Sequence, residues 1–220
     1  MNTQSLKVIN KYLSLPPIQA IFNKHKVAFV FVGGSRATKF YNEQSDYDLN
    51  FVVIDDCDYE RSIESNYYLV DDHMLHHYIL PLDAISKSGF GYAGLLIKCA
   101  VLNWDNIVWF ESRYINFINT YLSLSSEMGW IGTKKFVNTA VPFSHHKSFY
   151  SLLIAANLFL GSNYSDDYIW YYKNNHNKLN NKQTAQYEQN FNTIINQIKQ
   201  TEGSWEELWA PIYEKLKQTL

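Results

Sequence analysis

The chain has 220 residues and a formal net charge of −2, and 46 % of its residues are hydrophobic. This composition supports a sizeable buried core and excludes an intrinsically disordered chain. The near-neutral charge, with no long basic run, disfavours a protein that coats nucleic acid, although it does not exclude nucleic acid as a partner.

Two features of the chain bear on its environment. Its two cysteines, Cys57 and Cys99, lie far apart and form no CxxC motif, so we expect neither a disulfide framework nor a cysteine zinc site. The first residues lack a basic segment followed by a long apolar run, and no apolar run is long enough to span a bilayer. We therefore expect a cytoplasmic protein without a membrane segment.

The first quarter of the chain predicts two helices and two strands. Apolar residues recur at helical spacing over 4–14, Pro16-Pro17 end that helix, and a second short helix follows. The runs VAFVFV (27–32) and DLNFVVI (48–54) are rich in β-branched and aromatic residues, so both predict buried strands. A polar, turn-rich segment links the two strands.

A hairpin and a series of helices complete the predicted elements. Residues 66–83 indicate a strand pair that turns near Asp71-Asp72, and Gly161 follows an apolar run, as a C-capping glycine does. Periodicity predicts helices at 82–88, 92–104, 108–124, 132–143, 145–161, 168–175, 185–200 and 204–220. The predicted fold class is therefore α+β, with a small-sheet domain over 1–110 and a helical C-terminal domain over 111–220.

Asp46 and Asp48 stand one residue apart at the start of the second strand. Residues i and i+2 of a strand point to the same face, so the two carboxylates are predicted to lie together. Burying two like charges is costly unless a cation compensates, and carboxylate oxygens are ligands that Mg²⁺ prefers. The pair therefore predicts a magnesium–nucleotide site.

The segment Gly33-Gly34-Ser35-Arg36 directly follows the first strand. Two glycines let the backbone come close to a ligand, and a helix that starts near Ser35 would point its first N–H groups at a phosphate. The Ser35 hydroxyl adds a donor, and Arg36 either supplies charge for phosphate or pairs with an acid structurally. Each motif alone is a common turn or strand start, but their combination favours a nucleotide site.

The segment FVGGSRATKFYNEQSDYDLNFVV resembles the nucleotidyltransferase superfamily related to DNA polymerase beta. Gly34 and Ser35 match the glycine–serine part of the superfamily pattern, and Asp46 and Asp48 match its acid pair. The segment looks most like a branch of predicted bacterial and phage nucleotidyltransferases that includes RNA-repair-associated proteins. Further similarity to that branch covers 97–112 and 145–161.

The resemblance implies a small mixed sheet with flanking helices and a Mg²⁺ or Mn²⁺ ion held by the acid pair. It also implies transfer of a nucleoside monophosphate from an NTP, with ATP the first candidate, to an acceptor that the sequence does not identify. The superfamily usually has a third carboxylate on a neighbouring strand. The corresponding run here, 73–82, contains no acid, and His76 or His77 could take that place as a base.

Three interpretations stay open at the level of sequence. The first is an active nucleotidyltransferase, in which Lys147 could reach the triphosphate from the helical domain, although such a lysine is more often solvated. The second is a weak or inactive nucleotide-binding or antitoxin-like module that acts through a partner. The third is an unrelated α+β protein in which the motif is a coincidence. The histidines at 76 and 77 also have a plainer interpretation, as part of an exposed turn and a core histidine.

Overall fold

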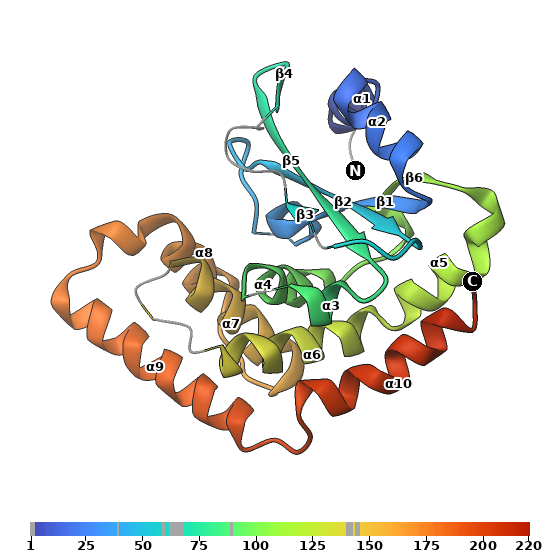
Figure 1. Ribbon diagram of the computed structural model, residues 1–220. Coiled ribbons are helices and arrows are strands. Elements are labelled where there is room, and N and C mark those ends of the chain that lie inside the picture. Colours follow the sequence, from blue (N-terminus) through green and yellow to red (C-terminus); the bar gives the residue numbers. More distant parts are fainter. Residues whose placement is uncertain are drawn as a thin grey trace. The chain divides into compact units, whose positions relative to one another are not determined.

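The computed structural model describes residues 3–38, 40–58, 60–61, 68–88, 90–139, 143 and 146–220 (Figure 1). By its contacts the chain divides into two compact units. The first unit comprises Met1–Ser88, Val101–Ser125 and Pro211–Leu220, and the second comprises Gly89–Ala100 and Ser126–Ala210. Among the helices of the described residues, none is long and apolar enough to cross a membrane.

A mixed sheet forms the centre of the first unit. Its strands lie in the order β3-β5-β2-β1-β6, and β4 pairs with β5. β2 and β5 run parallel, whereas the other pairings are antiparallel. The strands are β1 (Val27–Gly33), β2 (Tyr47–Val53), β3 (Glu60–Arg61), β4 (Tyr68–Val70), β5 (His73–Pro81) and β6 (Ile107–Phe110).

Helices of the first unit cover both faces of this sheet. On one face, α1 (Thr3–Leu13) and α2 (Pro16–Lys24) bury their apolar residues in one core with the side chains of β1, β2 and β5 (Figure 1). On the other face, Phe117 and Tyr121 of α5 (Ile115–Ser123) contact the ring of Phe29. The short helices of this unit are η1 (Gly34–Ala37), α3 (Ala84–Lys87), η3 (Trp104–Asn106) and η4 (Ser112–Tyr114).

Most of the predicted elements of this unit are confirmed. The first helix, both strands of the glycine–acid segment and the hairpin are present, and Asp71 and Asp72 form its turn with φ of 47° and 64°. The prolines at 16 and 17 do more than end the first helix, since α2 begins with them. Proline suits the first turn of a helix because its missing N–H would have no helical partner there.

One predicted helix is partly wrong. The periodicity predicted a helix over 108–124, but Ile107–Phe110 form β6, which pairs antiparallel with β1, and the α-helix begins only at Ile115. A run of four apolar residues fits a strand and a helix equally well, and the open edge of β1 decides in favour of the strand.

The second unit is helical, so the chain is α+β with a helical C-terminal region, as predicted. Gly161, with φ of +66°, lies two residues after Phe159, the last residue of α7, and is the predicted capping glycine. The helices are α4 (Phe90–Cys99), α6 (Ser125–Asn138), α7 (His146–Phe159), α8 (Asp166–Asn175), η5 (His176–Lys178), α9 (Asn181–Lys199) and α10 (Trp205–Lys217), the last of which continues into the first unit.

The division of the chain differs from a single cut at residue 110. α4 groups with the later helices. Leu96 of α4 lies so close to Gly132 of α6 that a Cβ added at Gly132 would come within 2.5 Å of the Leu96 Cβ. The segment after α4 returns to the first unit, because β6 pairs with β1. Each unit is therefore built from pieces distant in sequence.

Candidate functional site

Strand alternation places a set of polar side chains on one face of the sheet. Asp48 of β2 lies in register with Gly33 of β1 on one side and with His76 of β5 on the other. Partners in neighbouring strands point to the same face, as do residues two apart in one strand. Asn50 and Tyr78 therefore lie on this face as well.

Asp46, Asp48 and His76 form what we call the acid cluster. Two carboxylate oxygens and one ring nitrogen, one atom from each residue, lie within 4.8 Å of one another. His76 Nε2 is 3.4 Å from Asp46 Oδ2, and the Tyr78 hydroxyl donates to Asp48 Oδ1 at 3.3 Å. The His76 side chain is 5 % exposed and that of Asp46 is 32 % exposed, so the cluster has a buried side and a side that solvent reaches.

The glycine pair makes room for this cluster. A Cβ added at Gly34 would lie 1.7 Å from Asp48 Oδ2, and Gly34 has φ of +64°, which side chains rarely adopt. A Cβ added at Gly33 would lie 2.6 Å from Asn50 Nδ2. The Asp48 carboxylate therefore lies directly against the Gly34 backbone, next to Ser35 in the chain.

The helix that the sequence predicted at Ser35 is a single turn. η1 spans only Gly34–Ala37, and the Ser35 carbonyl accepts from the Thr38 N–H at 3.1 Å and from its hydroxyl at 2.8 Å. So short a turn lacks the summed dipole of an α-helix. η1 therefore offers no α-helix N-terminus to a phosphate, and the Ser35 hydroxyl and local backbone N–H groups are the donors left for such a role.

Arg36 binds the backbone of the loop that leads to Asp46. Its Nε donates to the carbonyl oxygens of Ser45 at 2.9 Å and Asp46 at 3.1 Å, and its Nη2 donates to that of Ser45 at 2.5 Å. Its guanidinium lies 3.7 Å from the ring centroid of Tyr47. Of the two roles predicted for Arg36, these contacts match the structural one, although its partners are carbonyl oxygens and not an acid.

His77 lies on the opposite face of β5 from the acid cluster. Its Nδ1 lies 2.7 Å from the hydroxyl of Tyr12 of α1, and burial lowers the pKa of its ring. His77 is therefore the core histidine of the plainer interpretation, and the prediction that it could serve as a base beside the two aspartates is wrong. Neighbouring residues of a strand cannot both face one site, and His76 is the one that does.

Lys147 was predicted to reach the triphosphate. It belongs to α7 in the second unit, and its side chain lies outside the described part of the structure. The predicted contact stays a prediction.

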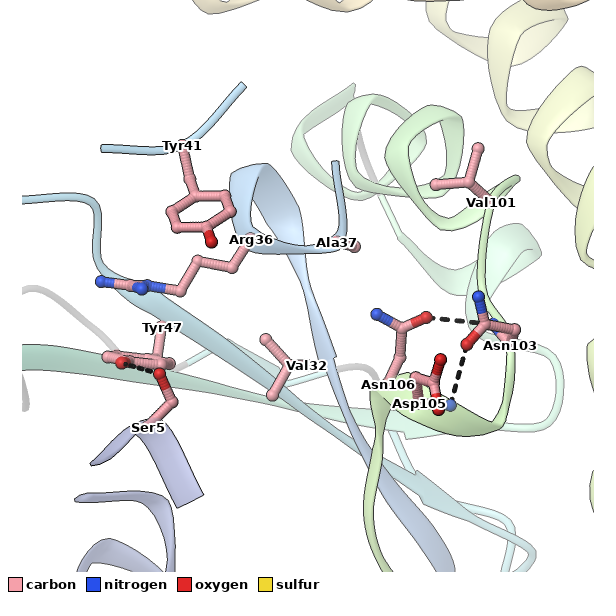
Figure 2. Close-up of a pocket in the computed structure, with 10 residues that line it drawn as sticks. All are labelled: Ser5, Val32, Arg36, Ala37, Tyr41, Tyr47, Val101, Asn103, Asp105 and Asn106. Atoms are coloured by element: carbon pink, nitrogen blue, oxygen red, sulfur yellow. Dashed lines mark hydrogen bonds between the residues drawn. The ribbon is translucent and has the colours of Figure 1, made fainter. Parts of the chain in front are cut away.

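A cavity of about 370 Å³ opens beside η1 (Figure 2). On one side Arg36 lies between the rings of Tyr41 and Tyr47, with Asn103, Asp105 and Asn106 along the other side (Figure 2). The residues that line it are Ser5, Val32, Arg36, Ala37, Tyr41, Tyr47, Val101, Asn103, Asp105 and Asn106, so the acid cluster lies outside it. The cavity is large enough for a small polar molecule.

Sequence reasoning missed two residues beside the acid cluster. Tyr78 holds Asp48, and Asn50 is fully buried and donates from Nδ2 to the Asp48 carbonyl oxygen at 3.0 Å. The Asn50 Oδ1 has no hydrogen-bond partner among the described residues. Both lie two positions after a predicted site residue on the same strand, so the alternation that paired the aspartates could have found them.

No protein family and no curated protein matches this chain. The likeness to nucleotidyltransferases therefore rests on the residues of the chain itself, above all those of the glycine–acid segment.

Proposed function

We propose that the chain is a divalent-metal-dependent nucleotidyltransferase that moves a nucleoside monophosphate from an NTP, ATP in the first instance, to an acceptor. The observation that carries the proposal is the convergence of Asp46 and Asp48, the second of which lies against the backbone of Gly34. A metal-bound triphosphate needs oxygen ligands for the cation and hydrogen-bond donors for its phosphates. The two aspartates supply the ligands, and the missing side chain of Gly34 lets the Asp48 carboxylate approach the backbone of η1, in which Ser35 follows.

The donor set of the acid cluster fits a divalent cation. Without a cation the carboxylates of Asp46 and Asp48 repel each other, and the partial burial of the cluster increases that repulsion. Carboxylates suit Mg²⁺ and Mn²⁺, whereas the imidazole of His76 binds transition metals better than Mg²⁺. The cluster therefore favours Mn²⁺ over Mg²⁺. When bound, the cation would neutralise charge on the triphosphate.

The side chains around the cluster have distinct roles in this proposal. Asp46 and Asp48 hold the cation, the Tyr78 hydroxyl fixes the orientation of Asp48, and Ser35 offers its hydroxyl to a phosphate oxygen. His76 is the third ligand of the cation, and the acceptor hydroxyl loses its proton to solvent as the acceptor oxygen bonds to the α-phosphorus. The bond from that phosphorus to pyrophosphate breaks, and pyrophosphate leaves.

A second candidate is a nucleotide-binding module that does not catalyse transfer. One observation favours it: the β5 residue that pairs with Asp48 is His76, where the resemblance implies a third carboxylate. Imidazole is a poor ligand for Mg²⁺, so the site could retain nucleotide binding and lose the chemistry. Such a module would act through a partner.

The rate of pyrophosphate release from each NTP, measured with Mn²⁺ and with water or the protein itself as acceptor, separates these candidates. We expect the wild-type protein to release pyrophosphate and Asp48→Asn to release it about a hundredfold or more slowly. Asp105→Asn, in the cavity outside the acid cluster, is the control that should keep the wild-type rate. Nucleotide binding without release would support the second candidate, and wild-type release by Asp48→Asn would overturn the proposal.

A further inference from the structure

A second group of ligand-type side chains lies at the other end of the β1–β2 pair. His25 precedes β1 by two residues, and Asp55 and Cys57 follow β2. The register of Val27 with Val53, continued by a bond from the Ile54 N–H to the Lys26 carbonyl at 3.1 Å, holds the two segments side by side. The sheet therefore brings these three residues together, away from the end where Asp48 faces Gly33.

The three side chains are close and partly enclosed. One ring nitrogen of His25, one carboxylate oxygen of Asp55 and the Sγ of Cys57 lie within 4.8 Å of one another. His25 Nδ1 is 2.7 Å from Asp55 Oδ2, and the side chains of these two residues are 6 % and 26 % exposed. Cys57 is half-buried.

Both segments are fixed by contacts with their surroundings. The His25 N–H donates to the Ile21 carbonyl at the end of α2, and the Lys26 N–H donates to Asp55 Oδ1 at 2.7 Å. The Nζ of Lys87 in α3 donates to the Cys57 carbonyl at 2.8 Å. The backbone that carries the three side chains is therefore held in place without any ligand.

A simple His–Asp pair does not account for the whole group. The pair gives Nδ1 of His25 a hydrogen-bond partner in Asp55. Nε2 of the same ring is buried and has no hydrogen-bond partner among the described residues. A buried polar atom normally has a partner, because leaving it without one costs free energy. The pair also does not explain why a thiol lies within ligand distance.

We infer that His25, Asp55 and Cys57 bind a zinc-class divalent cation, with water completing the coordination. Nitrogen, oxygen and sulfur ligands together suit Zn²⁺ and its analogue Co²⁺, whereas Mg²⁺ takes oxygen ligands only. The Cys57 thiol loses its proton to solvent when the metal binds. The ion fastens the start of β1 to the segment after β2.

The sequence pointed away from this site, since it contains neither a CxxC motif nor a histidine close to either cysteine in the chain. The ligands come from two segments thirty residues apart along the chain, which the antiparallel pairing of β1 and β2 joins. The inference does not depend on the proposed nucleotidyl transfer, because it uses none of the residues of the acid cluster.

Cobalt titration of the full chain tests the site, since a thiolate bound to Co²⁺ gives a charge-transfer absorption band. The Asp48→Asn background removes binding at the acid cluster. In that background we expect each chain to bind one Co²⁺ and to show the charge-transfer band. Added Zn²⁺ should displace the Co²⁺ and remove the band. Adding Cys57→Ser should abolish the band and weaken Zn²⁺ binding by at least about tenfold, whereas adding Cys99→Ser, at the buried cysteine of α4, should leave both unchanged.

One further variant keeps the test decisive. His25→Gln should weaken Zn²⁺ binding as Cys57→Ser does. If His25→Gln does not fold, Cys57→Ser can still be assayed, because it removes a ligand with little change in side-chain size. A band that persists in Cys57→Ser, or Zn²⁺ affinity unchanged in both variants, would overturn the inference. Loss of Zn²⁺ binding in the Cys99 control would do the same.

Discussion

The identity of residue 34 is set by the side chain of residue 48. Gly34 has a positive φ, and the space that a Cβ would need is occupied by the Asp48 carboxylate. The glycine at position 34 and the acid at position 48 therefore depend on each other, because the carboxylate fills the space that a side chain at position 34 would need. This contact explains why a buried strand is followed by glycines opposite an acidic strand start.

Gly34→Ala should therefore damage the site more than its backbone strain alone predicts. A positive φ costs alanine about 1–2 kcal/mol, and Gly161→Ala, at φ of +66° with nothing within 4 Å of the added Cβ, carries only that cost. We expect Gly34→Ala to lose Mn²⁺-dependent ATP binding and Gly161→Ala to keep it, as measured by calorimetry. Equal ATP affinity in the two variants would show that the Asp48 contact is unimportant.

His76 allows a test of the missing third carboxylate. His76→Asp should raise the affinity for Mg²⁺ relative to Mn²⁺ by roughly tenfold, equivalent to about 1.4 kcal/mol, because it replaces a poor Mg²⁺ ligand by a good one. The metal-free variant should be less stable than the wild type, since three carboxylates then repel.

The measurement for His76→Asp is thermal unfolding with and without each metal. The control is His73→Asp, which changes a residue of the same strand on the opposite face of the sheet. It should leave the preference between the two metals unchanged. If Mg²⁺ fails to stabilise His76→Asp more than the wild type, residue 76 does not contribute to a metal site.

At the scale of elements, the loop before β2 is held by η1 through Arg36. We expect Arg36→Met to lower the free energy of unfolding of the first unit by about 1.5–3 kcal/mol, because it removes charge-assisted bonds to carbonyl oxygens but keeps the apolar stem. The control is Arg113→Met in the same unit, where the guanidinium lies 4.8 Å from the ring centroid of Tyr114. This variant should change the free energy of unfolding by only about 0.5 kcal/mol. Urea denaturation measures both, and equal effects would refute the role of Arg36.

The buried His77 should make the stability of the first unit depend on pH. Burial lowers the pKa of His77 in the folded protein, so the unfolded chain binds a proton there more readily. Its contribution to stability is complete above about pH 6.5, the ordinary histidine pKa, and is lost as the pH falls below it. His77→Gln should therefore show a weaker loss of stability on acidification than the wild type, measured by urea denaturation across this range. The same pH slope in both proteins would contradict this account.

At the scale of the whole molecule, local patterns predicted much of the secondary structure but not how it assembles. The β-branched runs identified β1 and β2 because a buried strand needs no partner to be recognised. The helix predicted over 108–124 includes three of the four residues of β6, since only the pairing with β1 makes this segment a strand. The grouping of 89–100 with the later helices likewise depends on contacts between distant segments.

The candidate site was predictable to the same extent. Asp46 and Asp48 lie together as alternation predicted, although Asp46 is the residue just before β2. Alternation could not choose between His76 and His77, since that choice depends on the register of β5 against β2. The role of Arg36 depends on carbonyl oxygens, which a sequence pattern does not display.

The most direct test of the central claim is calorimetric titration of the wild-type protein and Asp48→Asn with ATP, with and without Mn²⁺. The acid cluster predicts binding that requires the metal, and a loss of at least about tenfold in affinity in the variant. Asp72→Asn, at the exposed turn of the hairpin, should bind as the wild type does. ATP binding that is independent of both Mn²⁺ and Asp48, or no binding by the wild type, would contradict a metal–nucleotide site at this cluster.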